Sequence, residues 1–374
     1  MIKSEQFYQA VSSLCFKGIK DSYDPVKHLM NKQLRNRQWS VTLGTEELTS
    51  TAICLLGLYR SGMASMAGLD IPKVLAALNN ASKTHNYPGG IGLVIWANAV
   101  VDGLALADLL LQAGYPNLEA KHFISRLTTM ESSWLLSGLL HEYKRLPTDS
   151  TRKLISIMMA EVVARFNDTT ALFHHAAANA GIKDRIRKHI SNFADQIYSV
   201  QALSYAAIIL QQEEPLTIAR SCALRLIDLQ GPLGQWWWHY DSVSGGIAQA
   251  FPVYSVHQHA MAPMALMALT AANGGDFADS ISLSQQWLSN NELGLNLIDL
   301  KCNTIWRDIS PKENYLKKSM GNILELLGFY RGGAERSGHD LLRANFETRP
   351  YEWAWCLFAG AMSSGAPPPS PFIV

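Results

Sequence analysis

The residues best suited to chemistry lie in one short run, Trp236-Trp237-Trp238-His239-Tyr240-Asp241. In an ordinary core strand every second indole of this run would face water, which is costly for so large an apolar ring. Flat aromatic walls beside a few titratable groups are instead typical of a concave ligand site. We therefore predict that residues 236–241 line a ligand cavity. A structural turn in which all the rings are packed is the alternative.

Two histidines, His257 and His259, follow this run closely and could act as acid or base near neutral pH. We predict Asp241 and His257 as the catalytic acid–base pair, with Asp195 as a third catalytic candidate. Asp195 lies in the first turn of an expected helix, where the helix dipole alone would favour an acid. These side-chain types could also bind zinc, but their spacing is not diagnostic, so we predict neither a metal nor a cofactor.

A second cluster consists of Trp306-Arg307 and Glu347-x-Arg349-Pro-Tyr351. A guanidinium group is planar and suits a carboxylate or phosphate, although a salt bridge to Glu347 could simply fix a long loop. We expect Arg349 to orient an anionic group. The predicted substrate-binding residues are Trp236, Trp237, Trp238, His239, Tyr240, Gln196, His259, Trp306, Arg307, Glu347, Arg349 and Tyr351.

Composition restricts the class of protein. The chain has 374 residues, of which 48% are hydrophobic and 17% charged, with a formal net charge of +1. This near-neutral balance argues against nucleic-acid binding. Five scattered cysteines without a CxxC pair indicate a reduced, cytoplasmic setting. The N-terminus lacks the apolar region of a signal peptide, and polar residues interrupt the long apolar stretches, so we expect no membrane span. Oligomeric state is left open.

Apolar spacing, with Gly and Pro as stops, predicts six helix pairs. They are 46–60 with 72–82, 92–113 with 117–127, 131–145 with 150–166, 193–210 with 215–229, 256–272 with 277–288, and 351–363 with either 315–330 or the N-terminal helices.

The first helix of each pair is rich in small residues and apolar on all sides, as the inner ring of a barrel of helices requires. We predict an all-α protein with one domain over residues 1–374, an (α/α)6 toroid rather than an open solenoid. Residues 1–43 would be an N-terminal helical extension, and residues 290–350 a long irregular insertion. Because the inner helices of a toroid begin at the same end, the candidate residues should converge on one mouth, where helix dipoles favour negative charge.

Gln230-x-x-x-Gly234-x-Trp236 resembles the QW motif of terpenoid cyclases and protein prenyltransferases, which are α/α toroids. This resemblance implies the fold and an isoprenoid substrate whose carbocations the indoles would stabilise. The chain lacks the Asp-x-Asp-Asp sequence of class II cyclases, however. Asp299-Leu-Lys-Cys302 and His339 match the zinc ligands of prenyltransferases only loosely, so the resemblance carries the fold rather than the mechanism.

The loop rich in Trp, His, Tyr and Asp before an inner helix also resembles six-hairpin carbohydrate enzymes, the unsaturated glucuronyl hydrolases and sugar epimerases. This resemblance implies an enzyme acting on a saccharide or a glycan that contains uronic acid, by hydrolase, lyase or epimerase chemistry. The expected partner is therefore a small-molecule or oligosaccharide substrate. Two alternatives stay open: an enzyme resembling terpenoid cyclases that acts on an isoprenoid, and a non-catalytic helical binding protein.

Overall fold

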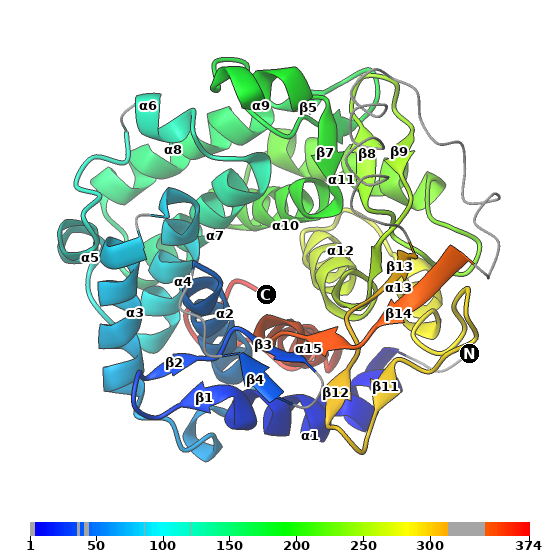
Figure 1. The fold of residues 1–374 in the computed structure, drawn as a ribbon. Helices are drawn as coiled ribbons and strands as arrows, with labels where there is room; N and C mark the ends of the chain where they lie inside the picture. Colours follow the sequence, from blue (N-terminus) through cyan, green and yellow to red (C-terminus); the bar gives the residue numbers. More distant parts are fainter. Residues whose placement is uncertain (1–3, 36–37, 41–44, 86, 120, 313–340) are drawn as a thin grey trace.

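Helices form a closed double ring in the computed structural model, which describes residues 4–35, 38–40, 45–85, 87–119, 121–312 and 341–374 (Figure 1). Within these residues, the inner ring consists of α2 (Thr45–Arg60), α4 (Ile91–Val101), α7 (Thr129–Arg145), α10 (Phe193–Leu210), α12 (Ala262–Ala271) and α15 (Pro350–Ser363). The outer ring consists of α1 (Ser4–Ser22), α3 (Ile71–His85), α5 (Leu106–Ala113), α8 (Asp149–Val163), α11 (Glu213–Asp228) and α13 (Ala278–Gln286). Each inner helix packs against the next, and α15 packs against α2, so the ring closes. The fold is an α/α toroid of six hairpins in a single domain, as predicted.

Small residues bring the inner helices close together. A Cβ atom on Gly92 of α4 would lie 2.3 Å from the backbone nitrogen of Leu135 on α7. A Cβ atom on Gly138 of α7 would lie 2.3 Å from the carbonyl oxygen of Gly92. The two helices therefore pack backbone against backbone, which side chains larger than hydrogen would prevent.

The second predicted pair is corrected by the structure. Residues 92–113 do not form one helix, because Asp102 adopts a left-handed conformation with φ of 56° and ends α4. Gly103 then donates its backbone N–H to the carbonyl oxygen of Asn98. The chain turns there, so α5 is the outer helix, and only the short α6 (Lys121–Ile124) forms within 117–127.

The N-terminal segment is part of the ring rather than an extension to it. Helix α1 packs along α15 and supplies its outer partner (Figure 1). Its buried residues recur at helical spacing: Tyr8, Val11, Cys15 and Ile19. The other candidate partner, residues 315–330, lies outside the described residues. After α1 the chain forms short strands rather than further helix.

Short strands of two to four residues lie in the loops. Three sheets, each of three strands, matter for the site. The first consists of β7 (Ile190–Asn192), β8 (His239–Asp241) and β9 (Ile247–Gln249), and the second of β10 (Val253–Tyr254), β13 (Asp308–Pro311) and β14 (Leu342–Asn345). The third consists of β15 (Glu347–Thr348), β3 (Gln33–Arg35) and β4 (Gln38–Ser40). Strands β7, β10 and β15 lead almost directly into inner helices. The described part of the predicted irregular insertion, 290–350, therefore contains strands that hold the loop residues in place.

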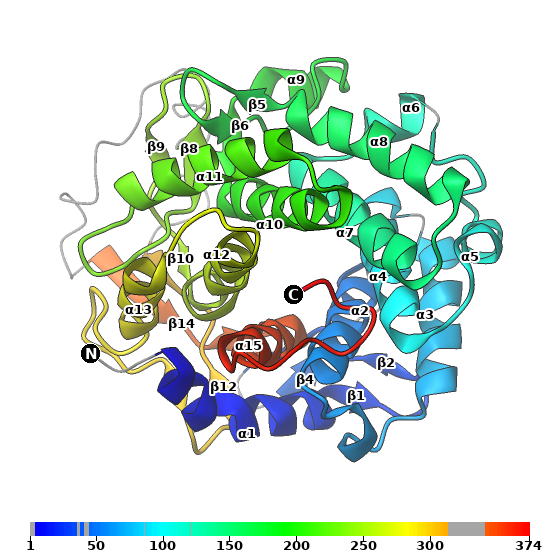
Figure 2. The same cartoon turned by 180° about the vertical axis from the view of Figure 1, so that it is seen from behind.

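The C-terminal segment fills the end of the ring at which the inner helices end. It leaves α15 and turns into the centre, where its last residues lie (Figures 1 and 2). The ring of Phe372 packs 6.0 Å from His141 of α7 and 5.7 Å from Phe358 of α15, measured between centroids. Arg60, at the end of α2, donates from Nε to the carbonyl oxygen of Val374 at 2.9 Å. The segment thus joins the far ends of three inner helices. None of the described helices is both long enough and apolar enough to cross a membrane.

Candidate active site

A cavity of about 430 Å³ lies at the end of the ring where the inner helices begin. Four inner helices and the helical turn that leads into α12 (His257–Met261) each line it with two residues spaced four apart, which places both on one face. These pairs are Thr49 and Ile53, Met130 and Trp134, Ala194 and Tyr198, His257 and Met261, and Tyr351 and Trp355. The loops before the helices add Tyr87, Asn192, Trp238, Tyr254, Val256, Arg307 and Arg349.

Aromatic rings form much of the cavity wall. The Trp134 ring meets the Tyr198 ring edge to face, with centroids 5.4 Å apart, and Trp355 lies 6.2 Å from the same tyrosine. Burial raises the pKa of the Tyr198 hydroxyl, and side-chain hydrogen bonds with Trp134 and Trp355 oppose that rise. The three side chains therefore form one connected wall of the cavity.

His257 lies in a stack of rings at the cavity wall. Its imidazole is 4.7 Å from the Phe193 ring and nearly parallel to Trp238, with centroids 6.2 Å apart. A π-helical turn, His257–Met261, precedes α12 and widens the start of this inner helix. Burial, and next the charge of Arg307, lower the pKa of His257 to about 3. The imidazole is therefore neutral at physiological pH, and its Nδ1 atom makes no hydrogen bond to a described residue.

Two arginines line the cavity beside a group of acids. Arg307 Nη1 lies 3.3 Å from Glu347 Oε1 and 3.4 Å from Glu352 Oε1, and its Nε lies 3.7 Å from Asp308 Oδ2. Arg349 Nε lies 2.9 Å from the same Oε1 atom of Glu347. The salt bridge to Glu347 that sequence analysis left open is present, and both arginines also line the cavity.

The phenols of this region stay protonated at neutral pH. The Arg307 guanidinium lies 5.1 Å from the centre of the Tyr254 ring, in a cation–π contact. Burial raises the pKa of Tyr254 to about 12 and also raises the pKa of Tyr351. Both hydroxyl groups can therefore donate hydrogen bonds to a ligand across the whole physiological range.

The prediction that the whole run 236–241 lines the cavity is wrong. Within the run only Trp238 lines it, while Trp236, Trp237 and Tyr240 are sealed in the core. Local hydrogen bonds hold them there, because Trp237 donates from Nε1 to Leu229 O at 2.8 Å and its backbone N–H donates to the Tyr240 hydroxyl at 3.1 Å. The packed-turn alternative therefore describes most of the run.

The two predicted catalytic aspartates are outside this cavity lining. Asp241 ends β8, is 3% exposed and accepts a hydrogen bond from the backbone N–H of Val243 at 2.8 Å. Asp195 is fully buried, and its oxygens accept from the backbone N–H groups of Met130 and Asn192. Its Oδ2 also lies 2.7 Å from His175 Nδ1. Asp195 therefore caps α10 and joins it to α7. Neither aspartate lines the cavity beside His257, and the catalytic pairing of Asp241 with His257 stays a prediction.

Five further predicted binding residues are not part of the cavity lining: Gln196, His239, His259, Trp306 and Glu347. Gln196 is fully buried and bonds the backbone of Phe173 through both its Oε1 and Nε2. His259 is fully buried, and its carbonyl oxygen accepts a hydrogen bond from the Tyr8 hydroxyl of α1 at 2.9 Å. His239 stacks on Trp238 at 4.8 Å, and Trp306 packs edge-on against Phe346 at 5.4 Å. Of these residues, His239 contacts the lining directly, through Trp238.

Several lining residues were not predicted as part of the site: Tyr87, Tyr198, Tyr254 and Trp355. For Tyr198 and Trp355, the signal that could have found them is the four-residue spacing from the first turn of their inner helices, whereas Tyr87 and Tyr254 lie in the loops before inner helices. Once Tyr351 is placed at the mouth, for example, Trp355 must follow one turn deeper on the same face. Glu352 was also missed, because its importance depends on Arg307, which is 45 residues away in the sequence.

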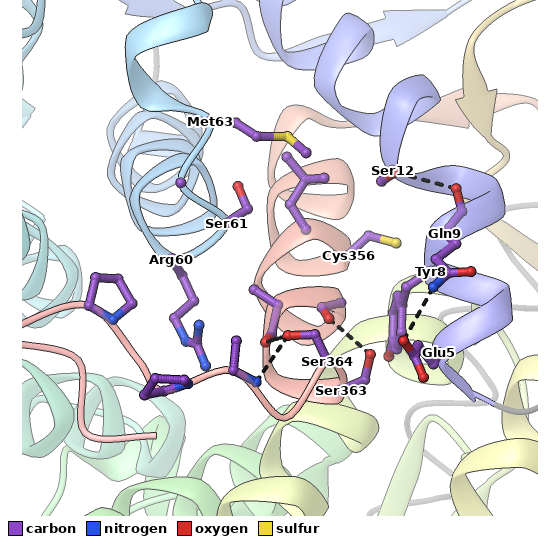
Figure 3. A pocket seen from close by; sticks show the side chains of 17 residues that line it. Glu5, Tyr8, Gln9, Ser12, Arg60, Ser61, Met63, Cys356, Ser363 and Ser364 are labelled. Atoms are coloured by element: carbon purple, nitrogen blue, oxygen red, sulfur yellow. Dashed lines mark hydrogen bonds between the residues drawn. The ribbon is translucent and has the colours of Figure 1, made fainter.

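A second pocket of about 410 Å³ lies at the other end of the molecule, between α1, α15 and the end of α2 (Figure 3). Its lining includes Tyr8, Arg60 and Cys356 and none of the predicted site residues. The hydroxyls of Ser363 and Ser364 donate to carbonyl oxygens of their own helix. We therefore place the candidate active site at the mouth where the inner helices begin.

No protein-family model matches the chain, and no curated protein matches its sequence. Solved structures do match. A sugar epimerase from a ruminal bacterium is 10% identical, with a TM-score of 0.63 over 97% of this chain and 99% of that chain. The unsaturated glucuronyl hydrolase of Bacillus sp. GL1 is 10% identical, with a TM-score of 0.62 over 95% of this chain and 96% of that chain. An unsaturated glucuronyl hydrolase specific for heparin is 9% identical, with a TM-score of 0.62 over 97% of each chain.

At this identity the likeness shows the fold alone, and it agrees with the six-hairpin architecture described above. The three matches named above are carbohydrate enzymes and lend no support to the resemblance to terpenoid cyclases. The residues of the QW-like motif have a local role here, since Gln230 donates from Nε2 to the carbonyl oxygens of Gly234 and Ser280. The motif thus joins the end of one hairpin to α13 of the next.

Proposed function

We propose that this protein is an enzyme that binds a saccharide in the mouth cavity and transfers protons on it. The observation that carries the proposal is the cavity lining, in which Trp238 and His257 lie beside two guanidinium groups. Indole faces stack on the apolar C–H faces of sugar rings, while guanidinium and phenol groups donate hydrogen bonds to sugar oxygens. The carbohydrate enzymes with the same fold support the proposal by analogy.

The size of the cavity suits a small saccharide or the end of a longer one. A volume of about 430 Å³ lies within the usual range of small-molecule sites, roughly 300–1,000 Å³. The core beyond it is filled with rings, since Trp355 of the lining packs against Trp96 at 5.9 Å, and Trp96 packs against His141 at 4.6 Å. The described cavity is therefore closed at its deep end.

The titratable groups of the described lining favour proton transfer at carbon. Neutral His257 can accept a proton from a carbon next to a carbonyl group, so that the C–H bond breaks and its electron pair forms an enolate. Arg307 and Arg349 would stabilise the enolate oxygen. Burial disfavours an imidazolium here, and the enolate formed beside it supplies the compensating negative charge. Return of the proton would give an epimer or isomer, and loss of a leaving group would give an elimination product.

The other reactions considered in the sequence analysis fit this lining less well. Glycoside hydrolysis usually requires two carboxyl groups placed at the scissile bond. The described lining instead offers an imidazole, four tyrosines and two arginines. An isoprenoid carbocation would be repelled by the two guanidinium groups.

Deuterium exchange tests the proposal. The protein is incubated in D2O with a panel of aldoses, ketoses and uronates, and proton NMR follows each C–H position next to the carbonyl carbon. We expect at least one sugar to exchange deuterium at such a position. Replacing His257 with Asn should lower the exchange rate by about 100-fold or more. Exchange at the wild-type rate in the His257→Asn protein would contradict the role of His257.

A further inference from the structure

We propose that Glu352 positions Arg307 and, by carrying a proton, allows this cavity to bind an anionic saccharide such as a uronate. The proposal rests on the function proposed above. Glu352 does not line the cavity itself, so it acts through Arg307 as a positioning residue.

The contacts of Glu352 connect it directly to the ligand-facing arginine. Its carboxyl group is fully buried in the first turn of α15. Oε1 lies 3.4 Å from Arg307 Nη1, and Oε2 accepts a hydrogen bond from the Thr348 hydroxyl at 3.4 Å. Arg307 comes from the strand region before β13, so this contact fixes a guanidinium from a distant loop against the start of an inner helix.

Charge balance requires a proton in this cluster. Among the described residues, two guanidinium groups, Arg307 and Arg349, face three carboxyl groups, Glu347, Glu352 and Asp308. If all five were ionised, the cluster would carry one excess negative charge in a buried environment, which is unfavourable. One carboxyl group should therefore be protonated at neutral pH.

Glu352 is the carboxyl group that fits this requirement. Glu347 has the shortest arginine contact, at 2.9 Å, and Asp308 accepts hydrogen bonds from Ser310 and from Asn345. Among the described residues, the Glu352 carboxyl group has the two longer contacts, to Arg307 and Thr348, and it has no exposure to water. Its burial raises its pKa to about 8, against the opposing charges of Arg307 and Arg349.

The proton then controls which ligands can bind. With Glu352 neutral, the cluster has no excess charge, and the arginines can attract a carboxylate. Ionisation of Glu352 places a negative charge 3.4 Å from Arg307, which repels an anionic ligand and competes for the same guanidinium. A neutral sugar held by stacking and hydroxyl contacts should be affected much less.

The tyrosines and the histidine beside the cluster do not change charge near pH 8. Burial raises the pKa of Tyr254 to about 12 and raises that of Tyr351, and His257 is already neutral because its pKa is lowered to about 3. Burial also raises the pKa of Asp308, but the hydrogen bonds from Ser310 and Asn345 oppose that change.

Binding measurements as a function of pH test the proposal. Isothermal calorimetry is run with D-glucuronate and D-glucose between pH 6.5 and 9.5 on the wild-type protein, on Glu352→Gln and on Glu142→Gln. Glu142 is a matched control, because it is a buried acid paired with Arg145 at 2.8 Å at the other end of the ring. For the wild type we expect the Kd of glucuronate to rise by up to about tenfold per pH unit above pH 8, while that of glucose changes little.

The Glu352→Gln protein should bind glucuronate as the wild type does at pH 7 and lose the pH dependence, whereas Glu142→Gln should retain it. The same pH dependence in Glu352→Gln as in the wild type would overturn the proposal.

Calorimetry of the wild type in two buffers of different ionisation enthalpy gives a second test if the variant does not fold. Uptake of a proton when glucuronate binds near pH 8.5 is expected, and no uptake would overturn the proposal. Binding of glucose without glucuronate would reject this inference alone, while binding of no saccharide at all would reject the proposed function as well.

Discussion

At the scale of single residues, neighbouring tryptophans of one run have opposite environments. Trp237 is 2% exposed and its ring nitrogen donates to the carbonyl oxygen of Leu229, whereas Trp238 lines the mouth cavity. The two residues are of the same type and are adjacent in the sequence. Their roles differ because one is part of the folded core and the other is placed to contact a ligand.

We expect Trp237→Ala to lower the free energy of unfolding by about 3–5 kcal/mol, because it removes a large buried ring and a buried hydrogen bond. Trp238→Ala should lower it by much less, since part of that ring already contacts water in the cavity. Chemical denaturation of both variants beside the wild type measures the difference. Equal losses for the two variants would contradict the distinction.

Asp195 is the residue whose predicted role changed most, from catalysis to support of α10. Replacing it with Asn should cost about 1–3 kcal/mol, because the charge-assisted contact with His175 is lost. Asp195 raises the pKa of His175 above 6.5, so this stabilisation is fully present below pH 6.5 and is lost as the pH rises through the raised value. Melting temperatures at pH 6 and pH 8.5 should therefore show a larger deficit at pH 6. A deficit that grows with pH would argue against this contact.

At the scale of elements, the glycines of the inner ring set the distance between helices. Gly138 has the carbonyl oxygen of Gly92 where a Cβ atom would be, at 2.3 Å, and a backbone atom cannot rotate away. Helices α4 and α7 must separate to admit any side chain. The first turn of α7 carries Met130 and Trp134 into the cavity, so this spacing also fixes one wall of the site.

Gly138→Ala should therefore destabilise the protein by about 1–3 kcal/mol, the usual cost of overpacking. Gly246→Ala is the matched control, because a Cβ atom there would meet nothing closer than 3.7 Å. The control should change stability by no more than about 0.5 kcal/mol. If thermal melting finds both variants equal to the wild type, the close packing of α4 against α7 is not as described.

Elements with clear local signals were predictable, and contacts between distant segments were not. Helices α7 and α10 begin at capping boxes, Thr128 with Glu131 and Asn192 with Asp195, and both agree closely with the predicted ranges. The end of α4 at Asp102 was missed, because a left-handed aspartate has no strong sequence signature. The short strands were missed for a related reason, since two or three residues are too few to show alternation.

The site was predictable in its location but not in its membership. Arg307, Arg349, Tyr351, Trp238 and His257 were predicted as site residues and do line the cavity. Their neighbours depend on pairings such as that of Arg307 with Glu352, which no local pattern encodes.

At the scale of the whole molecule, the ring has one filled end and one end with a cavity. The C-terminal segment packs Phe372 against His141 and Phe358 and so connects α7 with α15 at the filled end. Arg60 adds α2 through its hydrogen bond to Val374. The ring is therefore closed by the packing of α15 against α2 and is further connected at this end by the C-terminal segment.

Phe372→Ala should lower the free energy of unfolding by about 3–5 kcal/mol, although the residue lies in a segment without regular secondary structure. Leu111→Ala on α5 is the control, because Leu111 is 72% exposed and should contribute little. Denaturation curves of the two variants test whether the segment supports the ring. A Phe372→Ala protein as stable as the control would show that it does not.

The most direct test of the central claim is a saccharide screen by thermal melting on the wild-type protein and on Trp238→Ala. A saccharide present at a hundred times its Kd should stabilise the wild type by about 2.7 kcal/mol, seen as a raised Tm. We expect at least one neutral or anionic sugar to do so, and we expect the same sugar to have little effect on Trp238→Ala because the stacking surface is gone. If no saccharide raises the Tm of the wild type, or if one raises the Tm of both proteins equally, the mouth cavity is not the saccharide site described here.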